Sequence, residues 1–150
     1  MKQVAILTLV LCLLVGMCVP ASAAVIIPDG TFSSDYFASY GCIIGDNGGH
    51  VLHITFTCTG MGVCDEIGVA TYCVDKLVTL EDGSQGWMAV TGLLPGVTRT
   101  NAAFCTYGLN FQGIAGERYR VRATFTCTKT INGVVGTEHK SVTTTGCTVD

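Results

Sequence analysis

Strict alternation of apolar and polar residues marks two segments of the chain. In residues 51–59 the apolar set is Leu52, Ile54, Phe56 and Cys58, and the intervening set is His53, Thr55 and Thr57. In residues 117–128 the apolar set is Tyr119, Val121, Ala123, Phe125 and Cys127, and the intervening set is Arg118, Arg120, Arg122, Thr124 and Thr126. Because side chains alternate between the two faces of a strand, this period of two predicts two β-strands with one buried face each.

Further strands are predicted where Val and Thr are frequent, because branching at Cβ favours extended backbone. These segments are 67–74, 76–81, 84–91, 102–110 and 138–145. Turn sequences separate them, namely Asp46-Asn47-Gly48-Gly49, Asp82-Gly83, Pro95-Gly96 and Asn132-Gly133. No stretch after the N-terminal segment shows a helical period. We therefore expect an all-β fold of short strands, a β-sandwich of immunoglobulin-like pattern whose inward cysteines join the sheets by disulfides.

The Asn132-Gly133 turn poses a conflict. A two-residue loop there would place Cys127 opposite Glu138 and Phe125 opposite Lys140. Charged side chains are poor partners for a buried face, so a bulge or a longer loop is expected instead.

The N-terminus has the order of a secretory signal peptide. Lys2 is followed by an apolar run over residues 4–19 and by Pro20-Ala21-Ser22-Ala23-Ala24, with small residues at the cleavage positions. The run is too short for a retained membrane span, and Met17 is a poor residue before a lipoprotein cysteine at Cys18. We expect cleavage after Ala23, leaving residues 24–150 as a single secreted or periplasmic domain after a signal peptide of residues 1–23.

Charge and hydropathy reduce the classes of partner that the chain is expected to bind. The chain has 8 Lys and Arg against 11 Asp and Glu, a formal net charge of −3, and loss of Lys2 makes the mature form slightly more acidic. An acidic surface argues against nucleic-acid binding. No second long apolar segment exists, so no stable membrane span is expected after cleavage. The expected partner is an extracellular protein or a glycan.

Cysteine usage agrees with export. Of 9 cysteines, two leave with the signal peptide, and an odd number remains in a compartment where thiols pair. One free thiol or one intermolecular disulfide follows. Spacing cannot settle connectivity, although Cys58 with Cys64 and Cys127 with Cys147 are the favoured bridges. Close metal-binding pairs are absent, which disfavours zinc. The disulfide candidates are Cys42, Cys58, Cys64, Cys73, Cys105, Cys127 and Cys147.

A short repeat divides the chain. Thr55-Phe56-Thr57-Cys58-Thr59 recurs as Thr124-Phe125-Thr126-Cys127-Thr128. Each copy has one cysteine before it and one after it, which indicates two related half-units over about 38–75 and 102–150. Two similar strands that converged in composition are the alternative.

No catalytic, cofactor or metal signature emerges. There is no G-x-S-x-G sequence, and Ser84 lies in a turn sequence. Asp29-Gly30-Thr31 lacks the second loop that an aspartic protease needs. A free thiol with a histidine as base would give a small hydrolase. Asp46, His50 and His53 form a ligand-like group only if His50 lies on a turn. The three histidines that could serve as base are His50, His53 and His139.

Two weak binding features remain. Arg118, Arg120 and Arg122 form a basic stripe that would dock an acidic partner or a sulfated glycan, or would simply be a solvated face with cross-strand threonines and acids. Exposed aromatic residues on a sheet would stack on sugars; these are Tyr36, Phe37, Tyr40, Trp87 and Tyr107. The sequence thus favours a non-catalytic structural or interaction domain, ahead of a carbohydrate-binding module and a small thiol hydrolase.

Overall fold

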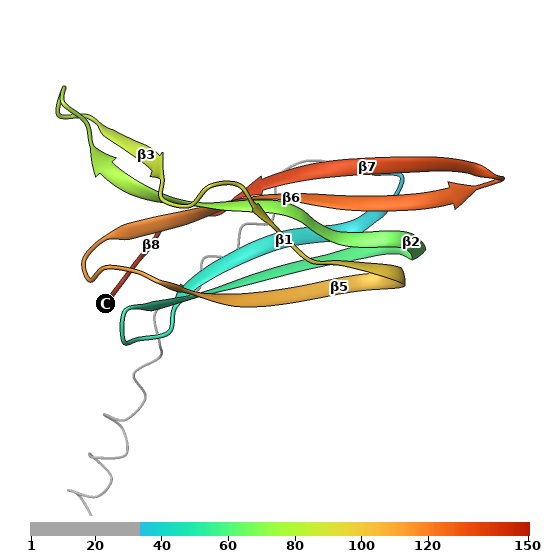
Figure 1. Cartoon of the computed structure of the whole chain (residues 1–150), viewed down its shortest axis with the longest axis horizontal. Coiled ribbons are helices and arrows are strands. Elements are labelled where there is room, and N and C mark those ends of the chain that lie inside the picture. Colours follow the sequence, from blue (N-terminus) through green and yellow to red (C-terminus); the bar gives the residue numbers. More distant parts are fainter. Residues whose placement is uncertain (1–33) are drawn as a thin grey trace, which may run out of the picture.

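The computed structural model describes residues 34–150 as an all-β fold (Figure 1). No helix occurs in this range, and so no helix there is long and apolar enough to cross a membrane. The strands are β1 (Phe37–Asp46), β2 (Val51–Thr79), β3 (Gln85–Ala89), β4 (Leu94–Pro95), β5 (Thr98–Gln112), β6 (Arg118–Ile131), β7 (Val134–Thr143) and β8 (Cys147–Thr148).

Strand β2 organises the sheet, because it pairs with five other strands. Its first half lies between β1 and β5, with Phe56 opposite both Cys42 and Tyr107. Its second half pairs with β6, with Val74 opposite Val121, and with the short strands β3 and β4. Strands β7 and β8 add to β6. Every pairing is antiparallel, and the eight strands form one sheet.

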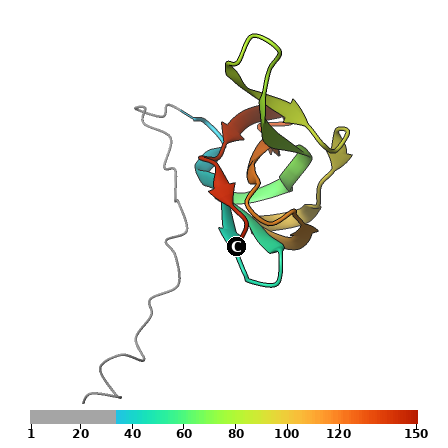
Figure 2. The ribbon, with the colours of Figure 1, turned by 90° about the vertical axis from the view of Figure 1, so that its left-hand side faces the viewer.

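The sheet is strongly curled. A shift of register between Thr59 and Cys64 bends β2, and Gly62 there has a φ of 86°, which favours glycine. Looking along the long axis, Figure 2 shows the strands surrounding a common interior. The expected two-sheet sandwich is not confirmed: one continuous open sheet, curled over itself, encloses the core, because β2 changes neighbours along its length.

The core confirms the predicted faces. Leu52, Ile54, Phe56 and Cys58 are buried, as are the five apolar residues of the second alternating segment. The full core cluster, which also draws on β1 and β5, is Phe37, Cys42, Ile44, Leu52, Ile54, Phe56, Cys58, Cys64, Ile67, Val69, Tyr72, Val74, Cys105, Tyr119, Val121, Ala123, Phe125, Cys127, Val142 and Val149.

The expectation of a longer loop at Asn132-Gly133 is wrong. Ile131 pairs with Val134, so the turn has two residues, and both have positive φ (53° and 79°). Cys127 does lie opposite Glu138 and Phe125 opposite Lys140. The charges are tolerated because β7 is an edge strand, where Lys140 Nζ lies 2.7 Å from Glu138 Oε1.

The first described residues, Ser34 and Tyr36, contact the same edge. Ser34 Oγ donates to Glu138 Oε2 at 2.7 Å, and the Tyr36 backbone N–H donates to the same oxygen at 3.2 Å. Charged residues turned inward on an edge strand also oppose further strand addition. The charged side chains of Glu138 and Lys140 therefore lie at the sheet edge, where they oppose pairing with a further strand, and not in the core.

Some predicted strands differ from those in the structure, and other predictions fall on residues that the structure does not describe. Residues 51–59, 67–74 and most of 76–81 form the single strand β2, and β1 was not predicted. The signal peptide of residues 1–23 and the Asp29-Gly30-Thr31 triplet lie outside the described residues. The duplication of half-units stays a prediction.

The backbone of Gly96 lies so close to Val69 on β2 that a substitution at Gly96 tests this packing. A Cβ added there would lie 2.3 Å from the Val69 carbonyl oxygen and 2.6 Å from the Val69 side chain. We expect Gly96→Ala to lower the free energy of unfolding by about 1–3 kcal/mol, as overpacking usually does, measured by urea denaturation.

The control is Gly92→Ala, because Gly92 lies only four residues earlier, in the connection between β3 and β4, and has no atom within 4 Å of an added Cβ. Equal stability of the two variants would contradict the packing of residues 94–98 against β2.

Candidate functional site

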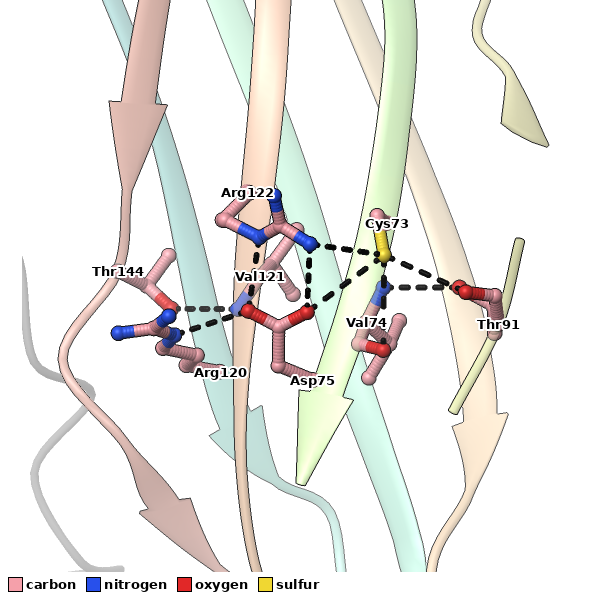
Figure 3. A network of polar contacts seen from close by, with 8 residues as sticks. All are labelled: Cys73, Val74, Asp75, Thr91, Arg120, Val121, Arg122 and Thr144. Atoms are coloured by element: carbon pink, nitrogen blue, oxygen red, sulfur yellow. Dashed lines mark hydrogen bonds and ion pairs between the residues drawn. The ribbon is translucent and has the colours of Figure 1, made fainter. Parts of the chain in front are cut away.

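The most polar buried site surrounds Asp75 on the outer face of the sheet (Figure 3). Near the end of β2, Tyr72 and Val74 point into the core, so Cys73 and Asp75 point outward. Asp75 is nevertheless only 1% exposed. The outer face is covered there by β6 side chains and by the chain following β3, where the Val90 N–H donates to the Val74 carbonyl oxygen at 2.9 Å.

Two arginines of β6 hold the Asp75 carboxylate. Arg122 Nε and Nη2 donate to its two oxygens at 2.8 and 2.9 Å, and Arg120 Nε donates to Oδ2 at 3.0 Å. Burial alone would raise the pKa of Asp75, but the hydrogen bonds and positive charges of Arg122 and Arg120 outweigh it and lower that pKa below its usual value. The carboxylate is therefore ionised at neutral pH.

Neighbouring groups fix the arginines in place. The Trp87 ring lies against Arg120, whose Cζ is 4.5 Å from the ring centroid, in a cation–π arrangement. Between the two arginines, the Val121 N–H donates to Thr144 Oγ1 at 2.9 Å. Arg118 Nη2 donates to the Gly146 carbonyl oxygen at 3.3 Å. The predicted stripe thus exists, and its acidic cross-strand partner is Asp75.

Cys73 joins the same network. Its thiol lies 3.5 Å from Arg122 Nη2 and 3.4 Å from the Thr91 carbonyl oxygen. Thr91 Oγ1 also accepts from the Val74 N–H at 2.9 Å. The segment after β3 is therefore tied to β2 through both the backbone and the side chain of Thr91.

A pocket of about 170 Å³ opens beside this network. It combines a guanidinium, a thiol, hydroxyl groups and an exposed leucine, and Thr124 and Ser141 hydroxyls lie 3.3 Å apart in its wall. Such a pocket offers hydrogen-bond donors to an anionic, hydroxylated ligand. Its lining residues are Thr71, Cys73, Leu93, Arg122, Ala123, Thr124, Ser141, Val142 and Thr143.

Two of the histidines and Ser84 contact other groups. His50 Nδ1 contacts the Asp150 carbonyl oxygen at 3.0 Å, and His53 Nδ1 contacts Asn110 Oδ1 at 2.8 Å. Ser84 Oγ donates to Asp82 in an exposed turn. No hydrogen bond within residues 34–150 joins a histidine to a cysteine or to Ser84.

The possible metal ligands are also kept apart. His50 does lie on the β1–β2 turn, with a φ of 64°, but Asp46 accepts from the Gly48 N–H and the Asp150 N–H. No group of three or more metal-ligating side chains occurs in residues 34–150.

The aromatic side chains do not form a shared exposed platform. Phe37 is buried, and Tyr40 lies between it and Phe125, with ring centroids 5.4 and 5.8 Å away. Tyr107 stacks on Phe56 at 5.8 Å. Tyr36, Tyr40 and Tyr107 all pack against the core, whereas Trp87 lies on the outer face under Arg120. The predicted sugar-stacking platform is not confirmed, because the tyrosine rings pack against the core and the Trp87 ring packs against Arg120.

The cysteines lie mostly in the core, as seven thiols. The predicted Cys127–Cys147 bridge is wrong, because Cys147 lies opposite Tyr119, about 26 Å along β6 from Cys127. The Cys58–Cys64 bridge is not confirmed: Cys64 Sγ lies 3.0 Å from Cys127 Sγ, and Cys58 Sγ contacts the Cys105 carbonyl oxygen. Burial raises the pKa of Cys42 and of Cys58 to about 12, which makes them poor nucleophiles.

Comparison of the chain with protein-family models, curated proteins and solved structures found no match.

Sequence reasoning missed the centre of the site. Asp75, Thr91, Leu93 and Ser141 were not candidates, because nothing local indicates that they meet Arg122. The one available signal was the acid at position 75 within an otherwise apolar segment, at the same alternating phase as Cys73.

Removing the buried carboxylate tests the network. Asp75→Asn leaves two arginines without their shared anion, so we expect a loss of about 3 kcal/mol in the free energy of unfolding at pH 7. Because folding lowers the pKa of Asp75, the stabilisation is complete above the unfolded pKa of about 3.9 and is lost as pH falls from there through the lower pKa of the folded state.

Urea denaturation from pH 7 to pH 3 should therefore show the difference between wild type and Asp75→Asn shrinking in acid. Asp35→Asn, which changes an exposed aspartate, is the control and should behave as wild type. A constant difference across this range would rule out the ionised carboxylate as the stabilising group.

Proposed function

We propose that this chain is an exported, non-catalytic interaction domain, and that it binds acidic glycans on its outer face around Arg122. The observation that carries the proposal is a half-exposed guanidinium held in a fixed orientation at a pocket rich in hydroxyl groups. Arg122 is 50% exposed in its side chain, although Asp75 anchors it from one side.

Anchoring prepares Arg122 for a ligand. Nε and Nη2 are bonded to Asp75, whereas Nη1 has no hydrogen-bond partner among residues 34–150. A guanidinium already held in place loses less conformational entropy when it binds a carboxylate or sulfate group. The arrangement supports recognition of an anion at the pocket mouth.

Charge complementarity supports an acidic partner. This strand face has three arginines, Arg118, Arg120 and Arg122, and only the last two share the carboxylate of Asp75. The face therefore has an excess of positive charge, while the whole chain has a net charge of −3. A local excess of positive charge on an acidic protein concentrates binding of anions at that face.

The rest of the pocket suits a sugar. Hydroxyl groups of Thr71, Ser141 and Thr143 exchange hydrogen bonds with ring hydroxyls, and Leu93, which is 73% exposed, offers an apolar contact. This surface replaces the aromatic residues as the proposed sugar-binding element.

The proposal also includes export and a non-catalytic role. The N-terminal segment with its small-residue cleavage positions and the cysteine-rich mature chain support secretion with disulfide formation. His50, His53 and Ser84 are engaged with other partners, which supports a binding role over hydrolysis.

Binding to a sulfated and to a carboxylated polysaccharide, measured by calorimetry at low salt, tests the proposal. Arg122→Gln should weaken the affinity at least about tenfold, since a charge-assisted hydrogen bond is lost, and added salt should weaken binding of the wild type.

Arg99→Gln is the matched control, because Arg99 is exposed and lies on β5 opposite Ile67, away from the pocket. It should stay within about twofold of wild type. Thermal melts would verify that both variants are folded at the assay temperature. No binding by wild type, or equal binding by the two variants, would sink the proposal.

A further inference from the structure

Two thiols meet in the core where β2 bends. Cys64 Sγ lies 3.0 Å from Cys127 Sγ, although the residues are 63 positions apart in the chain. Both side chains are buried, at 1% and 0% exposure. A disulfide bond is about 2.05 Å long, so an approach of about 1 Å would join the two sulfur atoms.

The bend provides the room for this contact. A Cβ at Gly60 would lie 2.3 Å from Cys64 Sγ, so a glycine at this position leaves space for the sulfur. Ile67 lies opposite Cys127 in the β2–β6 ladder, and the irregular turn from Thr59 to Cys64 brings the Cys64 thiol back onto the same buried face. The pair is thus produced by local backbone geometry as well as by strand register.

We propose that Cys64 and Cys127 form a disulfide that fastens the bend of β2 to β6. The proposal relies on the proposed export only for the compartment in which oxidation occurs. It is independent of glycan binding, because the thiols lie in the core and Arg122 lies on the outer face.

The oxidant is a disulfide, either a small molecule or a thiol–disulfide oxidoreductase. The Cys64 thiolate attacks it, the S–S bond of the oxidant breaks, and a mixed disulfide and one thiol form. The Cys127 thiolate then attacks Cys64 Sγ and releases the second thiol of the oxidant. Two thiol protons are lost, and the two electrons leave with the oxidant.

Burial determines when this exchange takes place. Burial, together with the hydrogen bond and charge of Cys64, raises the pKa of Cys127 to about 12. A thiol with this pKa reacts slowly once the core is closed. The bond therefore forms as the strands associate, and afterwards the same burial protects it from reductants.

Other pairings are less well placed. Cys58 and Cys105 lie opposite each other on β2 and β5, but their sulfur atoms point to backbone carbonyl oxygens of Cys105 and Val97. Cys73 is held in the outer-face network, and Cys147 lies near the end of β6 remote from Cys127.

Peptide mapping without reduction tests the pairing. The protein recovered from the medium or periplasm of expressing cells would be compared with the same protein after reduction, unfolding and refolding in a glutathione redox buffer. We expect one peptide pair joined through Cys64 and Cys127 in both samples.

Variants provide a second measurement. Cys64→Ser, Cys127→Ser and the double variant should each lose the linked peptides and show a similar fall in melting temperature, because all three remove one bond. Reduction of the wild type should lower its melting temperature, and Cys42→Ser should keep the linked peptides, since Cys42 lies on β1 away from the pair.

The outcomes separate the two proposals. Refolded protein in which Cys64 and Cys127 are both alkylated, or are linked to other cysteines, overturns the pairing. A correct link after refolding, with fully reduced protein recovered from cells, upholds the pairing and overturns export.

Discussion

The structure depends on the pairing of β2 along both of its edges. One strand of 29 residues supplies hydrogen bonds to β1 and β5 in its first half and to β6, β3 and β4 in its second. A slip of one residue in any of these ladders would turn Phe56 or Val74 to the opposite face. The bend between Thr59 and Cys64 lies where β6 replaces β1 as a neighbour, while β5 pairs with β2 on both sides of the bend. Both halves keep their apolar residues inside. Curling of the sheet and closure of the core follow from this arrangement.

Alternation in the sequence was sufficient to predict the two most regular segments, because residues 51–59 and 117–128 each have one face in a single core. It was not sufficient for β1. That strand contains Gly41 and Gly45 and has irregular burial, so its extended form is set by pairing with β2 rather than by local preference. The continuity of β2 was missed for a related reason, since its bend interrupts the period of two and suggests separate strands.

The Asn132-Gly133 turn shows a second reason why part of the fold could not be predicted from the sequence. The turn residues favour a two-residue hairpin, but such a hairpin places Glu138 and Lys140 opposite buried residues, and this conflict favoured a bulge or a longer loop. Only the position of β7 at the sheet edge, where Ser34 and Tyr36 meet Glu138, makes these charges acceptable. Asp75 was overlooked similarly: its arginine partners are 45 and 47 positions away, and sequence alternation indicates a face but not its neighbour.

The Asp75 ion pairs and the proposed Cys64–Cys127 disulfide lie at opposite ends of the ladder between β2 and β6. Near one end the Asp75 carboxylate binds Arg120 and Arg122, and near the other the Cys64 and Cys127 sulfur atoms meet. The ionic contacts weaken when the carboxylate is protonated, whereas a covalent bond there would not respond to pH. Closing a loop of this length restricts the unfolded chain by about 4 kcal/mol in the chain-entropy view, comparable to the loss expected on breaking a buried ion pair. With the proposed disulfide formed, independent chemistry would secure the register of the two strands at both ends, and the proposed ligand would bind at Arg122 without rearrangement of the sheet.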